Sequence, residues 1–198
     1  MSSAAISVGE TQQSWRLPYR GKIAMAGLII AESAIFTIFV VAYLFYVGKS
    51  LTGPTPSEVL EVPVFFTICL LSSSLTVHFA GKSLERNKRS AFLGWWLLTI
   101  ILGGLFLFGT GLEWHRLIYE RGLTISTNLF GTTYYSLVGL HAFHVTAGLV
   151  MLSIVLIFAL LGRVSADHSR RVNVLALYWH FVDAVWVVVF TVVYVLGR

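Results

Sequence analysis

Five ionisable side chains lie inside apolar stretches of this sequence and could do chemistry there. His141 and His144 are three residues apart, as are His180 and Asp183, so a helix would place each pair on one face. Glu32 lies alone in another apolar stretch. Ionisable groups are costly inside a membrane and usually face a helix bundle, where they carry protons, bind ions or fix packing. These five are therefore the first candidates for a proton-handling or buried polar network.

Glu32 requires a polar partner, because removing a lone carboxylate from water is costly. It lies about nine residues into its apolar stretch, roughly 13 Å at a rise of 1.5 Å per residue. His180 reaches a similar depth from the same side, so depth slightly favours it, although His141 and His144 also fall near mid-membrane. Two interpretations stay open: the pair handles protons, or it is a buried hydrogen bond that fixes helix register.

Histidines can also hold a metal ion or haem. A bis-haem membrane protein needs axial histidines at two well-separated heights, whereas His141 and His144 are less than a turn apart, which suits two hydrogen bonds better. A mononuclear site built from His141, His144 and His180 is conceivable. We expect hydrogen-bonded bundle histidines instead, and we predict no catalytic residue and no metal site in this chain.

Composition identifies the elements that must position these residues. Hydrophobic residues make up 57% and charged residues 12% of the chain, against about 45–50% and about 25% in soluble domains. Five apolar runs reach the roughly 20 residues that cross a bilayer. They cover about 23–47, 62–81, 91–112, 132–161 and 172–196. We predict an all-α membrane protein, with a polar lead-in at 1–22 and one five-helix transmembrane domain at 23–198.

Several function classes have no support in the sequence. Cys69 is the single cysteine, so neither a disulfide framework nor a CxxC metal pair is available. Gly-rich phosphate loops, GxSxG and HExxH are missing as well. The net charge of +5 comes from loops between apolar runs, so we expect no nucleic-acid partner. The polar N-terminal residues lack the apolar core of a secretory signal, and we expect no cleaved signal peptide.

Basic residues are divided unequally between the two sets of loops. Ten lysines and arginines lie in the lead-in and in the loops after the second and fourth spans, and four lie on the opposite side. Because positively charged loops are retained in the cytoplasm, we predict a cytoplasmic N-terminus and a periplasmic C-terminus.

A second group of side chains could contact lipid headgroups or an interface. Basic residues at helix ends suit headgroup phosphates, and tryptophans gather at membrane interfaces. The simpler interpretation of the charged members is a solvated flank. The candidates are Trp179, Trp186, Arg116, Arg121, His78 and Glu113.

Two histidine motifs carry a family resemblance when they are taken in order. The sequence YYSLVGLHAFHV occupies 134–145 and precedes Gly148, and YWHFVD occupies 178–183 and precedes Trp186. The acidic motif AES lies at 31–33. Together they resemble subunit III of haem-copper terminal oxidases, in the short five-helix bacterial form. The resemblance extends over nearly the whole chain.

The resemblance implies that haem and copper lie in partner subunits I and II and that this chain holds structural phospholipid in a cleft. It implies roles in complex stability and in oxygen or proton delivery. It also makes Glu32 the family's buried carboxylate and His141 its histidine partner. The sequence departs from the family at Ala142-Phe143, where Gly-Leu is frequent, and at His78, a lone histidine where the long form often has two.

The predicted function is that of a non-catalytic accessory subunit of a proton-pumping oxygen reductase in the bacterial inner membrane. Its complex would take electrons from cytochrome c or quinol, because subunit III of quinol oxidases and nitric-oxide-reductase-associated homologues fit the same motifs. A stand-alone proton-coupled transporter is a more distant alternative. It is disfavoured because transporters often contain two related halves, and this sequence shows no repeat.

Overall fold

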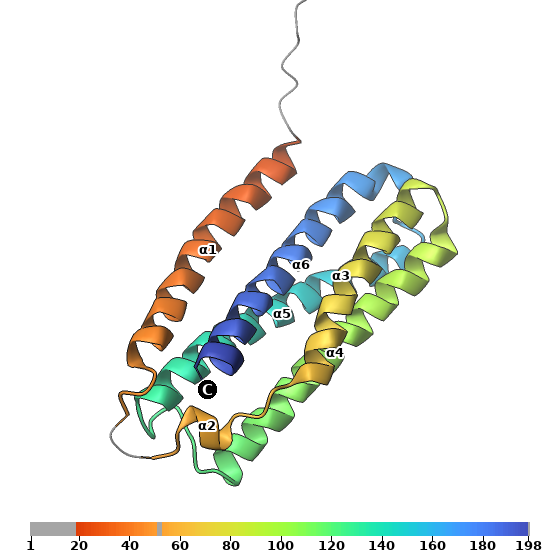
Figure 1. Cartoon of the computed structure of the whole chain (residues 1–198). Helices are drawn as coiled ribbons and strands as arrows, with labels where there is room; N and C mark the ends of the chain where they lie inside the picture. The colour runs from red at the N-terminus through yellow and green to blue at the C-terminus, as the bar shows by residue number, and fades with distance from the viewer. Residues whose placement is uncertain (1–18, 51–52, 198) are drawn as a thin grey trace, which may run out of the picture.

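The computed structural model of the protein describes residues 19–50 and 53–197, and within these ranges it is all-helical. Five long helices form the bundle of Figure 1. They are α1 (Arg20–Tyr46), α3 (Val64–Glu85), α4 (Arg89–Tyr119), α5 (Leu129–Leu160) and α6 (Ser169–Phe190), the last continuing as the π-helix η2 (Thr191–Leu196). The short α2 (Pro56–Val59) and the 3-10 helix η1 (Ala166–His168) lie in connections. The predicted all-α class is confirmed, and five helices are long and apolar enough to cross a membrane.

Several helices extend beyond the apolar runs that predicted them. Helix α3 ends at Glu85 rather than near 81, and α4 continues to Tyr119 rather than 112. Helix α4 has no proline after Arg89, and its first left-handed glycine is Gly122, just past its end. The segment between the predicted third and fourth spans, 113–131, therefore begins as helix. Most of the predicted lead-in, residues 1–18, lies outside the described residues.

Helices α3 and α4 form an antiparallel hairpin, visible in Figure 1 as the yellow and green ribbons. The turn is closed by Asn87, which has φ 56°. Its N–H donates to the Leu84 carbonyl over 3.0 Å, and the Lys88 N–H donates to the Ser83 carbonyl over 2.9 Å. This pair of bonds terminates a helix through one left-handed residue, a conformation that asparagine tolerates better than most side chains.

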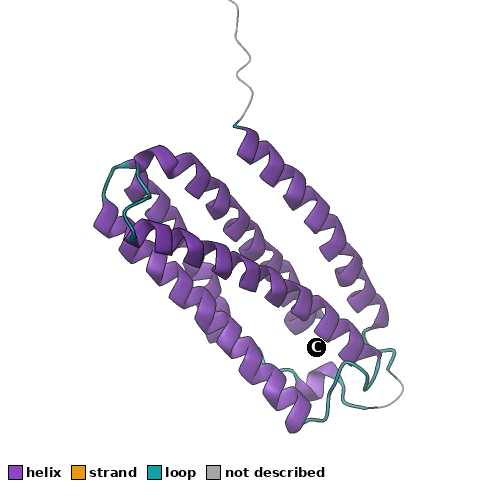
Figure 2. Ribbon diagram, turned by 180° about the vertical axis from the view of Figure 1, so that it is seen from behind, coloured by secondary structure: helices purple, strands orange, loops and turns teal. Residues whose placement is uncertain are grey.

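Helix α6 packs extensively against α1, α3 and α5. Helix α1 packs extensively against only two of the long helices, α5 and α6. Figures 1 and 2 both show α1 along one side of the bundle. Only Phe36 and Tyr43 are buried on α1. The first described residue and the C-terminus lie at opposite ends of the bundle (Figure 1), as an odd number of crossings requires.

Two glycines let α4 and α5 approach the same tryptophan of α6. A β-carbon at Gly103 would lie 2.8 Å from the Trp179 ring, and one at Gly148 would lie 2.7 Å from it. The Trp179 indole N–H donates to the Ser73 hydroxyl over 2.8 Å. Because lipid chains are as apolar as the helix surfaces, close packing and hydrogen bonds of this kind hold membrane helices together.

Candidate functional site

Glu32 of α1 and His144 of α5 form the central pair of the candidate site. The Glu32 Oε2 and His144 Nε2 atoms are 3.2 Å apart. The side chain of His144 is 8% exposed and that of Glu32 is 23% exposed. The two helices pack directly against one another, so the pair links the peripheral α1 to the body of the bundle.

The hydrogen bonds of this pair determine how many protons it can hold. His144 Nδ1 lies 2.8 Å from the Leu140 carbonyl oxygen. A carbonyl only accepts, so Nδ1 carries a proton, and the neutral ring would then present a lone pair at Nε2. Since Glu32 Oε2 also accepts when ionised, a hydrogen bond across the 3.2 Å gap requires one proton between the two atoms. When this hydrogen bond is formed, the pair therefore shares one proton, on either the carboxyl group or the imidazole.

His141 lies one turn before His144 but has a different environment. It is fully buried, and neither ring nitrogen has a hydrogen-bond partner among the described residues. Its ring stacks on Trp186 at a centroid distance of 4.9 Å and meets the edge of Phe106 at 5.7 Å. The expectation that both histidines make hydrogen bonds is therefore wrong for His141, because aromatic rings occupy its surroundings.

The partner of Glu32 differs from both sequence-based expectations. Depth favoured His180 and the family resemblance favoured His141, but the carboxylate contacts His144. The reason is rotational: His141 faces Trp186 inside the bundle, and His144 faces α1. Within 19–50 and 53–197, His, Cys, Asp and Glu side chains form no group of three that could hold a metal ion, so the alternative three-histidine site is not assembled.

His180 and Asp183 form a separate polar group with α3. Ser74 Oγ lies 2.9 Å from His180 Nδ1 and 2.5 Å from Asp183 Oδ2. Asp183 is 3% exposed, and His180 is partly buried. The structure thus divides the predicted polar network into the Glu32–His144 pair, the isolated His141, and this three-residue group.

Glu113 belongs to a third polar group, at the other end of the bundle from the start of α1. Tyr134 donates to its Oε1 atom over 3.1 Å, and Tyr194 donates to Oε1 and Oε2 over 2.9 and 3.0 Å. Both tyrosines are buried. The carboxylate thus joins α4, α5 and η2. It also lines a pocket with Glu61 and Arg116, so contact with a lipid headgroup or an interface remains a prediction for Glu113.

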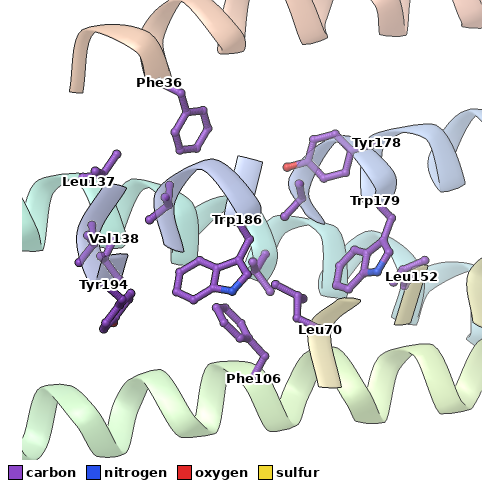
Figure 3. Packing of buried hydrophobic residues seen from close by; sticks show 14 of the residues in the cluster. Phe36, Leu70, Phe106, Leu137, Val138, Leu152, Tyr178, Trp179, Trp186 and Tyr194 are labelled. Atoms are coloured by element: carbon purple, nitrogen blue, oxygen red, sulfur yellow. The ribbon is translucent and has the colours of Figure 1, made fainter. Parts of the chain in front are cut away.

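Trp179 and Trp186 are interior residues, not interfacial ones. They are 0% and 1% exposed, and Figure 3 shows Trp186 at the centre of the buried cluster. The Trp186 indole N–H donates to Thr67 Oγ1 over 3.2 Å. The prediction of a lipid or interface contact is wrong for these two, because hydroxyl groups of α3 satisfy their N–H groups inside the bundle.

The remaining predicted residues are exposed, at or near the ends of helices. Arg116 pairs with Glu61, and both side chains are largely exposed. Arg121 is exposed just after α4, and His78 is exposed on α3 beside Phe79. Headgroup contact remains a prediction for these residues.

Sequence reasoning missed the hydroxyl groups that complete the polar groups. Ser74 bridges His180 and Asp183, and Tyr134 and Tyr194 cage Glu113. The run of serines within the apolar segment of α3 was a usable signal for Ser74. The tyrosines gave no comparable signal, because a buried tyrosine in an aromatic-rich sequence is usually a packing residue.

Comparison with known families gives a match over nearly the whole described structure. The family of cytochrome c oxidase subunit III matches residues 21–198, which include all three polar groups and all five long helices except the first residue of α1. The chain belongs to the cytochrome c oxidase subunit III family. The resemblance of the two histidine motifs is thereby confirmed.

The chain is similar to subunit III of two kinds of oxidase. Cytochrome c oxidase subunit 3 of Alkalihalophilus pseudofirmus is 35% identical over 168 residues, covering 84% of this chain and 82% of the relative. The Synechocystis cytochrome c oxidase subunit 3 is 38% identical over 172 residues, with coverages of 85% and 72%. Cytochrome bo(3) ubiquinol oxidase subunit 3 of Pseudomonas aeruginosa is 32% identical over 171 residues, with coverages of 85% and 81%.

Membership of the subunit III family and the five apolar helices identify a multi-pass bacterial membrane protein. The chain is a subunit III of the haem-copper oxidase family.

Proposed function

We propose that this chain is the non-catalytic accessory subunit III of a proton-pumping oxygen reductase that accepts electrons from cytochrome c. The family match across residues 21–198 carries the proposal. Haem and copper would lie in the catalytic subunit I and in subunit II, and this chain would stabilise their arrangement. It would carry out no redox step itself.

The decisive experiment is purification in mild detergent through a tag on this chain, with a visible spectrum and mass analysis of the co-purifying chains. A haem spectrum together with a large multi-span partner is expected. Reduction of the haems by added cytochrome c, and not by a quinol, would establish the donor. A colourless protein without partners would contradict the proposal and favour the transporter.

A quinol donor is the second candidate, supported by one observation. The ubiquinol oxidase relative from Pseudomonas aeruginosa shares 32% identity over 85% of this chain, only slightly less than the cytochrome c oxidase relatives. The same purified complex would then oxidise quinol directly, and reduced cytochrome c would leave its haems oxidised.

Within the complex, we propose that the Glu32–His144 pair exchanges its one proton with the neighbouring catalytic subunit. The position of Glu32 supports this proposal. The other helices cover α1 only weakly, so the Glu32 side chain, which shares a proton with His144, lies close to the outer surface of the bundle. Proton delivery from such a site would sustain turnover without any redox centre in this chain.

Phospholipid binding is the other proposed contribution. A cavity of about 350 Å³ lies where α5 turns into α6. Its lining residues include apolar Val155 and Phe158 and the basic Arg163 and Arg171. Apolar walls suit an acyl chain and arginines suit a phosphate. Lipid analysis of the purified complex tests this: replacing both arginines by glutamine should remove a co-purifying anionic phospholipid.

A further inference from the structure

A second pocket opens between α1, α3 and α6, at the end of the bundle where α1 begins. It is a pocket of about 320 Å³. Three apolar residues line it, and its other lining residues are polar or charged: Lys22, His78, Lys82, Glu85, Asn173 and His180. Because six of its nine lining residues are polar or charged and it lies at the end of the bundle, water can enter this pocket.

The innermost titratable lining residue leads to a buried carboxylate. His180 Nδ1 is 2.9 Å from Ser74 Oγ, and Ser74 Oγ is 2.5 Å from Asp183 Oδ2. Asp183 is 3% exposed. Two side chains, His180 of α6 and Ser74 of α3, therefore connect the pocket with an acid group that has almost no direct access to solvent.

The number of protons on Ser74 fixes the direction of these bonds. A serine hydroxyl has one proton to donate. When Asp183 is ionised, Ser74 gives that proton to Oδ2 and must accept from His180, so His180 carries its proton on Nδ1. The other nitrogen, Nε2, then has a free lone pair on the residue that lines the pocket. The histidine is thus held in the tautomer that can take up a proton from the pocket.

We propose that His180 and Ser74 relay protons between this pocket and the Asp183 carboxylate. A proton from water binds His180 Nε2, the Nδ1 proton passes to Ser74 Oγ, and the original hydroxyl proton passes to Asp183 Oδ2. His180 ends neutral with its proton on Nε2, Ser74 regains a hydroxyl, and Asp183 becomes a carboxylic acid. The reverse sequence returns the proton to the pocket.

A purely structural role explains these contacts less completely. Asp183 Oδ1 is buried and has no hydrogen-bond partner among the described residues. Leaving a buried carboxylate oxygen unpaired is costly, so a network that served only to join α3 and α6 would be expected to satisfy both oxygens. A carboxyl group that alternates between ionised and protonated states gives this position a use.

Other charged groups face the relay from each neighbouring element. Helix α3 contributes His78, Lys82 and Glu85, and α1 contributes Lys22. Asn173 of α6 donates to Glu85 over 2.7 Å. On the remaining sides, α5 presents His141 against Trp186, the Glu32–His144 pair lies between α1 and α5, and Glu113 faces the far end of α6 through Tyr194.

The test uses infrared difference spectroscopy of the intact oxidase complex, reconstituted in lipid nanodiscs. Aspartate labelled with carbon-13 marks the carbonyl stretch of a protonated aspartic acid, and Asp183→Asn assigns the band. The measured quantity is the rate at which this band shifts after transfer to D2O. Ser74→Ala removes the hydroxyl with little change in volume, Ser74→Thr restores it, and Glu32→Gln is a control at the separate pair.

We expect the Asp183 band to grow as the pH falls and to exchange rapidly in the wild type, in Ser74→Thr and in Glu32→Gln. Exchange in Ser74→Ala should be slower by about a hundredfold, in the range lost when a positioned proton-transfer group is removed.

Equal exchange rates in the alanine and threonine variants would overturn the relay. So would a wild-type band that is absent at every pH or never exchanges, a result that needs no variant to assemble. The outcome is independent of which electron donor the complex uses.

Discussion

At the scale of single residues, two histidines one turn apart have opposite environments. His144 joins the Leu140 carbonyl to Glu32, and His141 is enclosed by aromatic rings. A buried polar group with a partner and one without respond differently to substitution, because removing the first leaves its partner unpaired and removing the second does not. Substitution therefore distinguishes a histidine that holds a buried partner from one that only packs against aromatic rings.

Glu32→Gln should leave assembly intact and reduce turnover-linked proton uptake. The glutamine amide can donate to His144 Nε2, so the stability change should stay within about 1 kcal/mol, while the exchangeable proton is lost. Complex yield on a tag and proton uptake by reconstituted vesicles measure the two effects. Glu32→Ala is the harsher comparison, and loss of the whole complex in both variants would show that the residue is structural.

His141→Leu and His144→Leu should differ in stability. The first replaces an unpaired buried imidazole by an apolar side chain, so it should be neutral or stabilising. The second leaves Glu32 without its partner and should destabilise the protein by about 1–3 kcal/mol. Thermal unfolding in one detergent compares the pair. A larger loss for His141→Leu would mean that its nitrogens have a partner in the complex.

At the scale of elements, the helices are held by small residues and by hydroxyl groups that face tryptophans. Trp179 enters the space above Gly103 and Gly148 and donates to Ser73. Trp96 in turn donates to the Leu152 carbonyl over 2.9 Å and joins α4 to α5. Such contacts decide which faces meet, because apolar surface alone does not drive helices together in lipid.

Gly103→Ala should destabilise the bundle, whereas Gly104→Ala should not. The added methyl at Gly103 meets the Trp179 ring at 2.8 Å, and the neighbouring Gly104 has open space. Overpacking of this kind costs about 1–3 kcal/mol, while an unhindered glycine-to-alanine change in a helix gains up to about 1 kcal/mol. Unfolding followed by tryptophan fluorescence measures both. Equal effects would show that the α4–α6 contact is loose.

The connection before α3 should respond to acid. The Thr55 N–H donates to Glu58 Oε2 over 2.9 Å, and this bond lowers the pKa of Glu58 below its usual value. A folded-state pKa below the unfolded one stabilises α2 at neutral pH, and that contribution is lost as the pH falls through the lowered value. Amide hydrogen exchange at Thr55, corrected for intrinsic rates, should rise in acid for the wild type. Glu58→Gln should be insensitive to pH over the same range.

At the scale of the whole molecule, an odd number of crossings places the two ends of the bundle in different compartments. The pocket with Lys22 and Lys82 lies at one end, and the Arg116–Glu61 pair lies at the other. The excess of basic loops predicts that the first end is cytoplasmic. Protons entering through the His180 relay would then come from the cytoplasm.

Orientation can be measured with single cysteines in a Cys69→Ser background. Arg86→Cys should react with a membrane-impermeant maleimide only after the cells are lysed, and Lys49→Cys should react in intact spheroplasts. Both positions are exposed and lie at opposite ends of the bundle. The reverse labelling pattern would invert the topology and direct the relay to the periplasm.

The sequence by itself determined the number of helices, the family and which ionisable side chains lie inside the apolar runs. These properties depend on composition and local order: apolar runs of spanning length, and motifs such as YWHFVD at 178–183. Helix ends were less predictable, because Glu113 and Arg116 are polar residues that continue α4 as helix.

Only the tertiary structure decided which polar groups meet. Spacing put His141 and His144 on one face, but a small rotation about α5 sends one ring to Trp186 and the other to Glu32. Tryptophans that sequence placed at an interface are buried, because glycines and hydroxyls on other helices receive them. Pairings of this kind depend on the rotation and depth of several helices together, and a one-dimensional pattern does not record either quantity.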